Sequence, residues 1–257
     1  MWYVFPGLPT RPRSTSFRPW LLPEGCARIW PDPNAADPDE GLVAVGGDLS
    51  AERLVSAYAH GIFPWYSDDT PILWWCPEPR AVLERENLHV SRSLQRKLRK
   101  LEFTVTSDAS FDGVIDGCAE RTEGTWILPE MRAAYLKLHA LGLAHSFEVW
   151  QGTRLAGGLY GVQVGALFAA ESMFHRVTDA SKVALIYAVT ALFEAGFDLF
   201  DVQFVTPHLE SLGVTSIPRC EYLARVRASQ STRPAWSQVV NRLSLGLQKR
   251  ESGCPEL

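Results

Sequence analysis

The sequence predicts an α+β fold, with a small N-terminal domain and a larger C-terminal domain built on a mixed sheet. Three runs of apolar and small residues between positions 144 and 174 have the length and composition of successive strands. An amphipathic helix pattern precedes these runs, and a strongly apolar helix pattern and one more strand follow them. The chain has 257 residues, of which 46% are hydrophobic and 21% charged, so it can bury a sizeable core.

The N-terminal part of the chain is the less regular one. Residues 1–40 are rich in Pro, Gly and Asp and show no steady period, which predicts an irregular extension held by a few aromatic side chains. In the segment that follows, Asp48 or Ser50 can cap a helix. We expect this helix to run to about His60 and to end at Gly61.

A segment rich in proline separates the two parts of the chain. The run 72–75 has strand character between proline turns, and turn residues continue to position 80. We therefore expect a domain boundary near residue 80. The extension and the small domain would cover residues 1–80, and the larger domain residues 81–257.

The C-terminal part begins with a clear order of elements. A strand is predicted over 103–106, and helices over 111–119 and 129–142. Three strands then follow in the segments AHSFEVW, RLAGGLYGVQV and ALFAAESMF. Gly152 supplies the turn between the first two strands, and Gly165 the turn between the second and the third.

A buried helix and a last strand complete the predicted sheet. The helix covers residues 180–195 and ends at Gly196, and the strand is FDLFDVQFV. The order helix–strand–strand–strand–helix–strand is that of acyltransferases of the N-acetyltransferase (GNAT) type. Because one fold serves many reactions, this order predicts the architecture and not the activity.

The net charge of −4 conceals an uneven distribution. Residues 1–80 carry 6 basic and 10 acidic side chains, and residues 101–218 carry 6 and 14. Residues 81–100 carry 6 and 2, and residues 219–257 carry 7 and 3. The mild acidity argues against a protein that coats nucleic acid through bulk charge, but two basic blocks flank an acidic body.

The first basic block is predicted to be a helix. Ser91 can serve as its N-cap, and leucines at 94, 98 and 101 form one face. Most of the basic residues fall off that face, and they are Arg92, Arg96, Lys97, Arg99 and Lys100. They form either a solvated helix face or a docking surface for a phosphate backbone.

Several classes of protein are disfavoured by what the sequence lacks. No stretch of about 18 apolar residues exists, so a membrane span is not expected. The N-terminus is a poor signal peptide, and the five cysteines are odd in number and scattered, so we expect a cytoplasmic protein without a disulfide framework or zinc site. No phosphate-binding loop or dinucleotide motif is present, and no cofactor or metal is expected.

Three polar side chains stand in apolar strands. Asp201 and Gln203 are two residues apart, so strand geometry predicts both side chains on one face. Asp201 is either a structural residue or one that orients Gln203, whose neutral amide would position a reacting amine rather than accept a proton. Glu171 either pairs with an internal Arg or Lys or receives a cationic group of a substrate.

Aromatic and apolar residues supply the other candidates. Trp65 and Trp126 lie in turn-rich segments, where each is either a base-stacking platform or a packing anchor between domains. Phe168 and Met173 are near Glu171 in sequence, and Leu159 lies on the preceding strand. These three are either plain core or the lining of an apolar cavity.

A family resemblance runs through these segments. GLVAVGGDLSAERLVSAYAHGIFPWY, ILWWCPEPRAVL, HVSRSL, GTWI, AHSFEVW, GGLYGV, ESMF, DASKVAL, FDVQ and HLESLGVTSIPR follow one another from about residue 38 to residue 222. In this order they strongly resemble the leucyl/phenylalanyl-tRNA–protein transferase family. Several of the segments are long and distinctive, so chance is a poor explanation.

The resemblance implies an enzyme that moves Leu or Phe, and Met less well, from an aminoacyl-tRNA to the N-terminal Arg or Lys of a protein. The product would be a degradation signal of the N-end rule pathway. The implied partners are Leu-tRNA or Phe-tRNA and proteins that begin with Arg or Lys, and the implied enzyme is a monomer that needs no cofactor.

Site residues carry over from the family motifs by position. The implied catalytic residues are Glu171, Asp201 and Gln203. The aminoacyl-adenosine end would be held by Trp65 and Trp126. The pocket for the aminoacyl side chain would be lined by Leu159, Phe168, Met173 and Leu185. The tRNA-binding cluster would be Arg92, Arg96, Arg99 and Lys100, with Lys97 as a local addition.

The chain departs from the family pattern in a few places. The family usually has Gly, Asn and Ile at the positions of Ala170, Asp179 and Phe200. These differences do not change the expected reaction class, but they leave the preference between Leu and Phe open. Three alternatives are an aminoacyl-tRNA-dependent peptide ligase, a coenzyme A-dependent N-acetyltransferase and a catalytically silent tRNA-binding protein. The missing coiled-coil arm argues against the peptide ligase, and the missing pyrophosphate loop argues against the N-acetyltransferase. The presence of Glu171, Asp201 and Gln203 argues against the silent binding protein.

Overall fold

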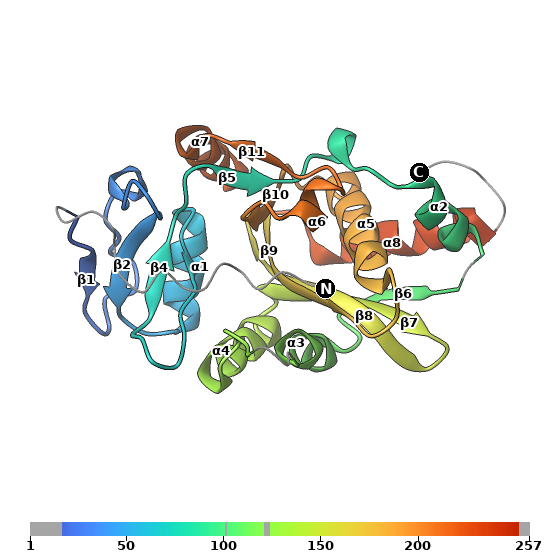
Figure 1. Cartoon of the computed structure of the whole chain (residues 1–257), viewed down its shortest axis with the longest axis horizontal. Coiled ribbons are helices and arrows are strands. Elements are labelled where there is room, and N and C mark those ends of the chain that lie inside the picture. Colours follow the sequence, from blue (N-terminus) through green and yellow to red (C-terminus); the bar gives the residue numbers. More distant parts are fainter. Residues whose placement is uncertain (1–16, 101, 121–123, 252–257) are drawn as a thin grey trace.

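Two β-sheets organise the chain in its computed structural model, which describes residues 17–100, 102–120 and 124–251 (Figure 1). The smaller sheet has the strand order β1-β2-β4-β3, and the larger one β11-β5-β10-β9-β8-β7-β6. The strands are β1 (Trp20–Leu22), β2 (Leu42–Gly46), β3 (Phe63–Pro64), β4 (Leu73–Trp75), β5 (Arg80–Val82), β6 (Thr104–Ser107), β7 (Ala144–Gln151), β8 (Arg154–Val164), β9 (Leu167–His175), β10 (Leu199–Gln203) and β11 (Thr215–Ile217).

Helices cover both faces of the larger sheet. In Figure 1, α3 and α4 lie below the sheet, and α5 and α8 lie above it. The helices are α1 (Ala51–Ala59), α2 (Arg92–Arg99), α3 (Phe111–Ala119), α4 (Pro129–Ala140), α5 (Ala180–Glu194), α6 (Pro207–Glu210), α7 (Arg219–Ser229) and α8 (Trp236–Glu251). Among the described residues, no helix combines the length and the apolar character needed to cross a membrane.

The predicted α+β class is confirmed, and the sheet is mixed. Strands β7, β8 and β9 form two antiparallel hairpins, whereas β10 runs parallel to β9 after the crossover through α5. Gly152 and Gly165 supply the two hairpin turns as predicted, with φ of 60° and 61°. The predicted helices also form, and Ser50 caps α1 while Ser91 caps α2.

The apolar side chains form two clusters, because successive side chains of a strand point to opposite faces of the sheet. The first cluster joins the small sheet and α1 to the α3 and α4 face of the larger sheet, and Tyr160 belongs to it. The second cluster lies on the α5 and α8 face, and Leu159 belongs to it. Helix α5 is buried almost all round, which explains its continuous apolar sequence.

Short strands are the main difference from the sequence prediction. The extension predicted to be irregular contributes β1, which pairs with β2 in parallel. Strand β5 joins β10 and β11 in the larger sheet, just at the boundary that we predict near residue 80. The last strand is shorter than the predicted segment FDLFDVQFV, because Gln203 adopts a φ of 60° and the Phe204 N–H turns back to the Val202 carbonyl.

Two irregularities lie side by side where β9 and β10 diverge. The parallel pairing of these strands ends at Ala169 and Asp201. Just beyond these residues, a bulge in β9 leaves Glu171 without a paired residue on β8. A second register shift lies between Asp201 and Gln203, in the pairing of β10 with β5. Bulges re-aim side chains and interrupt pairing, so Glu171 and Gln203 face each other beyond the last paired residues.

Candidate active site

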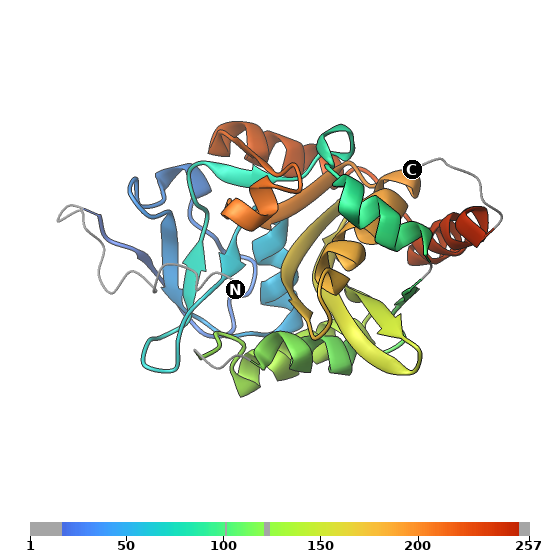
Figure 2. The same ribbon diagram turned by 45° about the vertical axis from the view of Figure 1, so that its right-hand side comes forward.

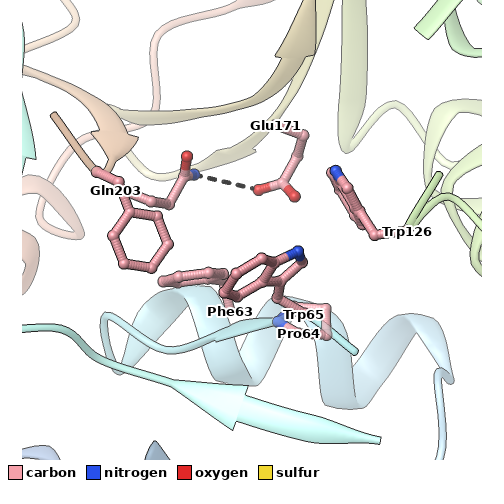
Figure 3. Close-up of a pocket in the computed structure, with 7 residues that line it drawn as sticks. Phe63, Pro64, Trp65, Trp126, Glu171 and Gln203 are labelled. Atoms are coloured by element: carbon pink, nitrogen blue, oxygen red, sulfur yellow. Dashed lines mark hydrogen bonds between the residues drawn. The ribbon is translucent and has the colours of Figure 1, made fainter. Parts of the chain in front are cut away.

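A pocket opens between the two sheets, at the end of the β9–β10 pairing (Figure 3). Its residues come from the small sheet, from the segment before α4, and from β9, β10 and the residue after β10. They are Phe63, Pro64, Trp65, Trp126, Glu171, Gln203 and Phe204. The lining therefore combines one carboxylate and one amide with aromatic rings.

One wall of the pocket is a set of contacting aromatic rings. The ring of Phe204 lies 5.7 Å from that of Phe63 and 5.7 Å from that of Trp65. Trp75 on β4 fixes this wall, because its indole N–H donates a hydrogen bond of 2.6 Å to the carbonyl of Trp65. These rings offer flat apolar surfaces on which a nucleobase or an aromatic side chain can stack.

Trp126 forms another wall of the pocket. It lies in the short segment before α4, where Pro129 occupies the first turn of the helix. The hydroxyl of Thr125 accepts a hydrogen bond from the Ile127 N–H, which orders the backbone on both sides of the tryptophan. Figure 3 shows Trp126 beside Glu171, on the side away from Gln203.

Among the described residues that line this pocket, Glu171 is the only one with an ionisable side chain. Its Oε2 accepts a hydrogen bond of 2.9 Å from Tyr135, and its Oε1 lies 3.4 Å from Nε2 of Gln203. Burial raises the pKa of Glu171 to about 7, although hydrogen bonds from Tyr58 and Tyr135 act in the opposite direction. The carboxyl group therefore changes its charge near neutral pH.

Asp201 lies behind the pocket in a buried ion pair. Arg80 donates to both of its carboxylate oxygens, through Nε at 2.7 Å and Nη2 at 2.6 Å, and both side chains are fully buried. Tyr222 donates a further hydrogen bond of 3.0 Å. The same guanidinium reaches the carbonyl of Gly61 at 3.2 Å, just before the aromatic wall of the small sheet.

Asp201 contacts Gln203 through the backbone. The N–H of Gln203 donates to Oδ1 of Asp201 at 3.0 Å. This bond fixes a residue whose φ of 60° is unusual for a side chain with a Cβ atom. The predicted link between the two residues is therefore present, but the amide side chain points to Glu171 and the carboxylate to Arg80.

The four residues predicted to line an aminoacyl pocket are not among those that line this one. Leu159, Phe168 and Leu185 are buried in the second apolar cluster, on the α5 face, and Met173 packs against that cluster. The register of β8 and β9 does bring Leu159 opposite Met173. Their predicted role in holding the aminoacyl side chain stays a prediction.

The predicted tRNA-binding residues lie on α2 and at its C-cap, Lys100, at the end of the molecule away from the small sheet (Figure 1 and Figure 2). Arg92, Arg96 and Lys100 are exposed. Lys97 forms an ion pair of 2.6 Å with Asp179, so part of its charge is neutralised within the protein. The side chain of Arg99 lies outside what the structure describes.

Several residues of the site were not predicted from the sequence, among them the pocket-lining Phe63, Pro64 and Phe204. Arg80 is the single charged residue at the start of an apolar strand, and this is the one signal that could have indicated a buried partner. Tyr58 and Tyr135 look like ordinary members of amphipathic helices, and both are buried beside Glu171. Such pairings depend on tertiary structure and leave no local pattern.

One group of residues outside the pocket has side chains that commonly bind metals. Asp108, His139 and His145 lie together between β6, α4 and β7. Nδ1 of His145 is 2.7 Å from Asp108, and Nδ1 of His139 is 2.9 Å from the carbonyl of Ala144. Asp108 also accepts the Ser146 N–H, so internal hydrogen bonds already account for these atoms.

Family models and similar proteins all point to one family. The model described as "Leucyl/phenylalanyl-tRNA protein transferase" matches residues 82–227, and that of the family's N-terminal domain matches residues 47–78. A protein named leucyl/phenylalanyl-tRNA–protein transferase from Anaeromyxobacter sp. (strain Fw109-5) is 56% identical over 201 residues, which are 77% of this chain and 85% of the relative. One of the same name from Methylococcus capsulatus is 51% identical over 210 residues, 80% of this chain and 89% of the relative.

The similarity to solved structures is distant. A GCN5-related N-acetyltransferase-like protein from Streptococcus suis is matched with a TM-score of 0.33 and 12% identity, over 62% of this chain and 61% of that one. The structure of L-PGS from Bacillus licheniformis is matched with a TM-score of 0.36 and 11% identity, over 65% and 57%.

The buried ion pair gives a prediction about stability. Asp201→Asn leaves the Arg80 charge buried without its counter-charge, which should lower the free energy of unfolding by about 3–5 kcal/mol in urea denaturation. Asp116→Asn is the matched control, because Asp116 pairs with Arg132 at 2.5 Å but is half exposed. It should cost about 1 kcal/mol or less. Equal losses in the two variants would contradict this account.

Proposed function

Because the chain belongs to the leucyl/phenylalanyl-tRNA–protein transferase family, and is therefore an aminoacyltransferase, we propose that the pocket between its two sheets is the catalytic site. The reaction would move Leu or Phe from aminoacyl-tRNA to the N-terminal Arg or Lys of an acceptor protein. The observation that supports it most is the pair Glu171 and Gln203, which face each other in an aromatic-lined pocket.

The aromatic walls would bind the donor. Trp65 and Trp126 present rings at the pocket, and stacking on such rings suits the terminal adenosine of a tRNA. The side chain of the transferred residue would enter an apolar space. The residues predicted to line it are Leu159, Phe168, Met173 and Leu185. An apolar pocket separates side chains by about 1–3 kcal/mol per methylene, so Leu, Phe and Met would be accepted with graded efficiency.

The polar residues would act mainly by orientation. The donor is an ester, which is already reactive, so holding amine and ester in line can supply several kcal/mol of the barrier reduction. The Glu171 carboxylate would interact with the cationic end of the acceptor, and the Gln203 amide would align the attacking amine. Asp201 lines no part of the pocket and would act as a positioning residue, through the backbone of Gln203.

The product would carry Leu or Phe at its new N-terminus, and we propose that this marks the protein for degradation by the N-end rule pathway. A catalytically silent tRNA-binding protein is the alternative that an assay must separate. Glu171, Asp201 and Gln203 are all present, which favours the enzyme. Asp201 accepts a hydrogen bond from the Gln203 backbone, and the Gln203 amide contacts Glu171.

An assay of transfer separates these functions. We expect the chain to move labelled Leu from Leu-tRNA to peptides that begin with Arg or Lys and not to a matched peptide that begins with Ala. Transfer to all three peptides would indicate another aminoacyl-tRNA-dependent ligase. Binding of tRNA without any transfer would indicate a silent binding protein.

Replacement of the amide tests the positioning role of Gln203. Gln203→Ala should lower the single-turnover rate of transfer by about 100-fold, because a small misplacement of a reacting group has an effect of that order. Gln238→Ala, on the exposed face of α8, should leave the rate unchanged. An unchanged rate in Gln203→Ala would remove this residue from the mechanism.

Charge reversal on α2 tests the tRNA contact. Arg96→Glu should weaken binding of tRNA and reduce the slope of log affinity against log salt by about one, as expected for one lost phosphate contact. Arg227→Glu makes the same change on an exposed position of α7 and serves as the control. If both variants bind with the same affinity and salt dependence, the basic residues of α2 are only a solvated face.

A further inference from the structure

Two buried tyrosines hold one side of the Glu171 carboxylate. Tyr135, on α4, donates a hydrogen bond of 2.9 Å to its Oε2. The hydroxyl of Tyr58, on α1, lies 2.5 Å from the hydroxyl of Tyr135. Both tyrosines act as hydrogen-bond donors toward the Glu171 carboxylate, and their two hydroxyls also contact each other. Both rings are buried, so packing of two helices fixes the chain of three groups.

The other carboxylate oxygen remains for the pocket. Oε1 of Glu171 lies 3.4 Å from Nε2 of Gln203, a contact longer than an ordinary hydrogen bond. A carboxylate oxygen can accept more than one bond, so most of the capacity of Oε1 is left for a group bound in the pocket. The tyrosines thus orient the carboxylate without occupying the oxygen that faces the substrate.

The surroundings of Glu171 suit a group that exchanges a proton at neutral pH. Burial raises its pKa to about 7, the two tyrosines and Arg80 lower it, and the charge of Asp201 raises it. Burial and the charge of Glu171 raise the pKa of both tyrosines well above the usual range, so they stay neutral donors. The ionisable groups around the carboxylate are Tyr58 of α1, Arg80 of β5, Tyr135 of α4, Tyr160 of β8 and Asp201 of β10.

The proposed reaction needs a proton acceptor. The α-amino group of an acceptor protein is protonated below about pH 8, and only its neutral form attacks an ester. The amide of Gln203 is a poor base, and both oxygens of Asp201 already accept bonds from Arg80. Of the polar residues that the structure describes at this pocket, Glu171 is the remaining candidate.

We propose that Glu171, held by Tyr135 and Tyr58, takes the proton from the α-ammonium group of the acceptor protein. Glu171 is then a catalytic base, and the two tyrosines are positioning residues. The proposal rests on the proposed function, because it assigns a role within aminoacyl transfer.

Atoms and charges balance in this step. The α-ammonium gives one proton to the Glu171 carboxylate, and the neutral amine attacks the ester carbonyl. The C–N bond forms as the bond between the carbonyl carbon and the ribose oxygen breaks. The nitrogen loses a second proton to the leaving ribose oxygen, and Glu171 releases its proton to water after the products leave.

The pH dependence of transfer tests the proposal. In Tyr135→Phe the carboxylate loses a donor, so the pKa of Glu171 should rise. The acidic limb of the single-turnover rate should then move to higher pH by about one unit. The same peptide is used throughout, so ionisation of its own amine contributes equally. Tyr66→Phe is the control and should leave the acidic limb in place, because the hydroxyl that it removes donates to Glu130 and not to Glu171.

A titration of the free enzyme separates the two parts of the proposal. The ¹³C-carboxyl signal of Glu171, assigned by its loss in Glu171→Gln, should titrate at higher pH in Tyr135→Phe than in the parent chain. Tyr58→Phe should shift it in the same direction, and it is the second variant if Tyr135→Phe folds poorly. This measurement needs no transfer activity, so it stands even where the proposed function fails.

Each outcome decides a different point. If the titration and the rate profile both move, Glu171 is the base and the tyrosines tune it. If the titration moves but the profile of an active enzyme stays, another group takes the proton and the proposal is overturned. If the titration stays, the tyrosines do not position Glu171, which also overturns it. Absence of transfer in the parent chain counts against the proposed function alone.

Discussion

The buried pair of Arg80 and Asp201 is the constraint on which both walls of the pocket depend. Taking two charges out of water is costly unless nearly every donor and acceptor is satisfied, so the partners of this pair are held firmly. On one side the guanidinium bonds the carbonyl of Gly61 and lies 4.7 Å from the ring of Phe63, which ties it to the small sheet. On the other side the carboxylate holds the N–H of Gln203. One ion pair therefore sets the position of the aromatic wall relative to the amide.

The sheet creates room for the pocket by interrupting its own pairing. Strands β9 and β10 pair as far as Ala169 and Asp201, and each then departs from a regular ladder. In regular strands, the side chains of Glu171 and Gln203 would point to the faces of the sheet set by strand alternation. Both residues would then lie beside a paired neighbouring strand and not beside open space. The bulges instead direct both toward the space between the two sheets, where the aromatic residues of the small sheet close it.

The sequence predicts most of the large sheet but little of what joins the two sheets. Strands β7 to β9 and helix α5 are long, apolar and bounded by glycine turns, so their patterns are easy to interpret. Strands β1, β3, β5 and β11 have two or three residues, too few to show a period. In the site, Trp65, Trp126, Glu171 and Gln203 are predicted and do meet at one pocket. The role of Arg80 follows from a partner 121 residues away, which no local pattern reveals.

The acidic net charge and the binding of an anionic polymer are compatible because the two kinds of charge lie in different places. The exposed arginines lie on α2, at the end of the molecule away from the small sheet (Figure 1). Glu171 lies in the pocket that is lined by Phe63 and Trp65 of the small-sheet side. A phosphate backbone meeting α2 would therefore not face the carboxylate, whose charge would repel it if exposed. The ion pair between Lys97 and Asp179 neutralises an acidic charge beside α2. Because Asp179 is the N-cap of α5, the same ion pair holds α2 against the start of α5. The basic surface is thus anchored to the same helix that packs on the large sheet, which keeps it in a fixed relation to the strands that carry Glu171 and Gln203.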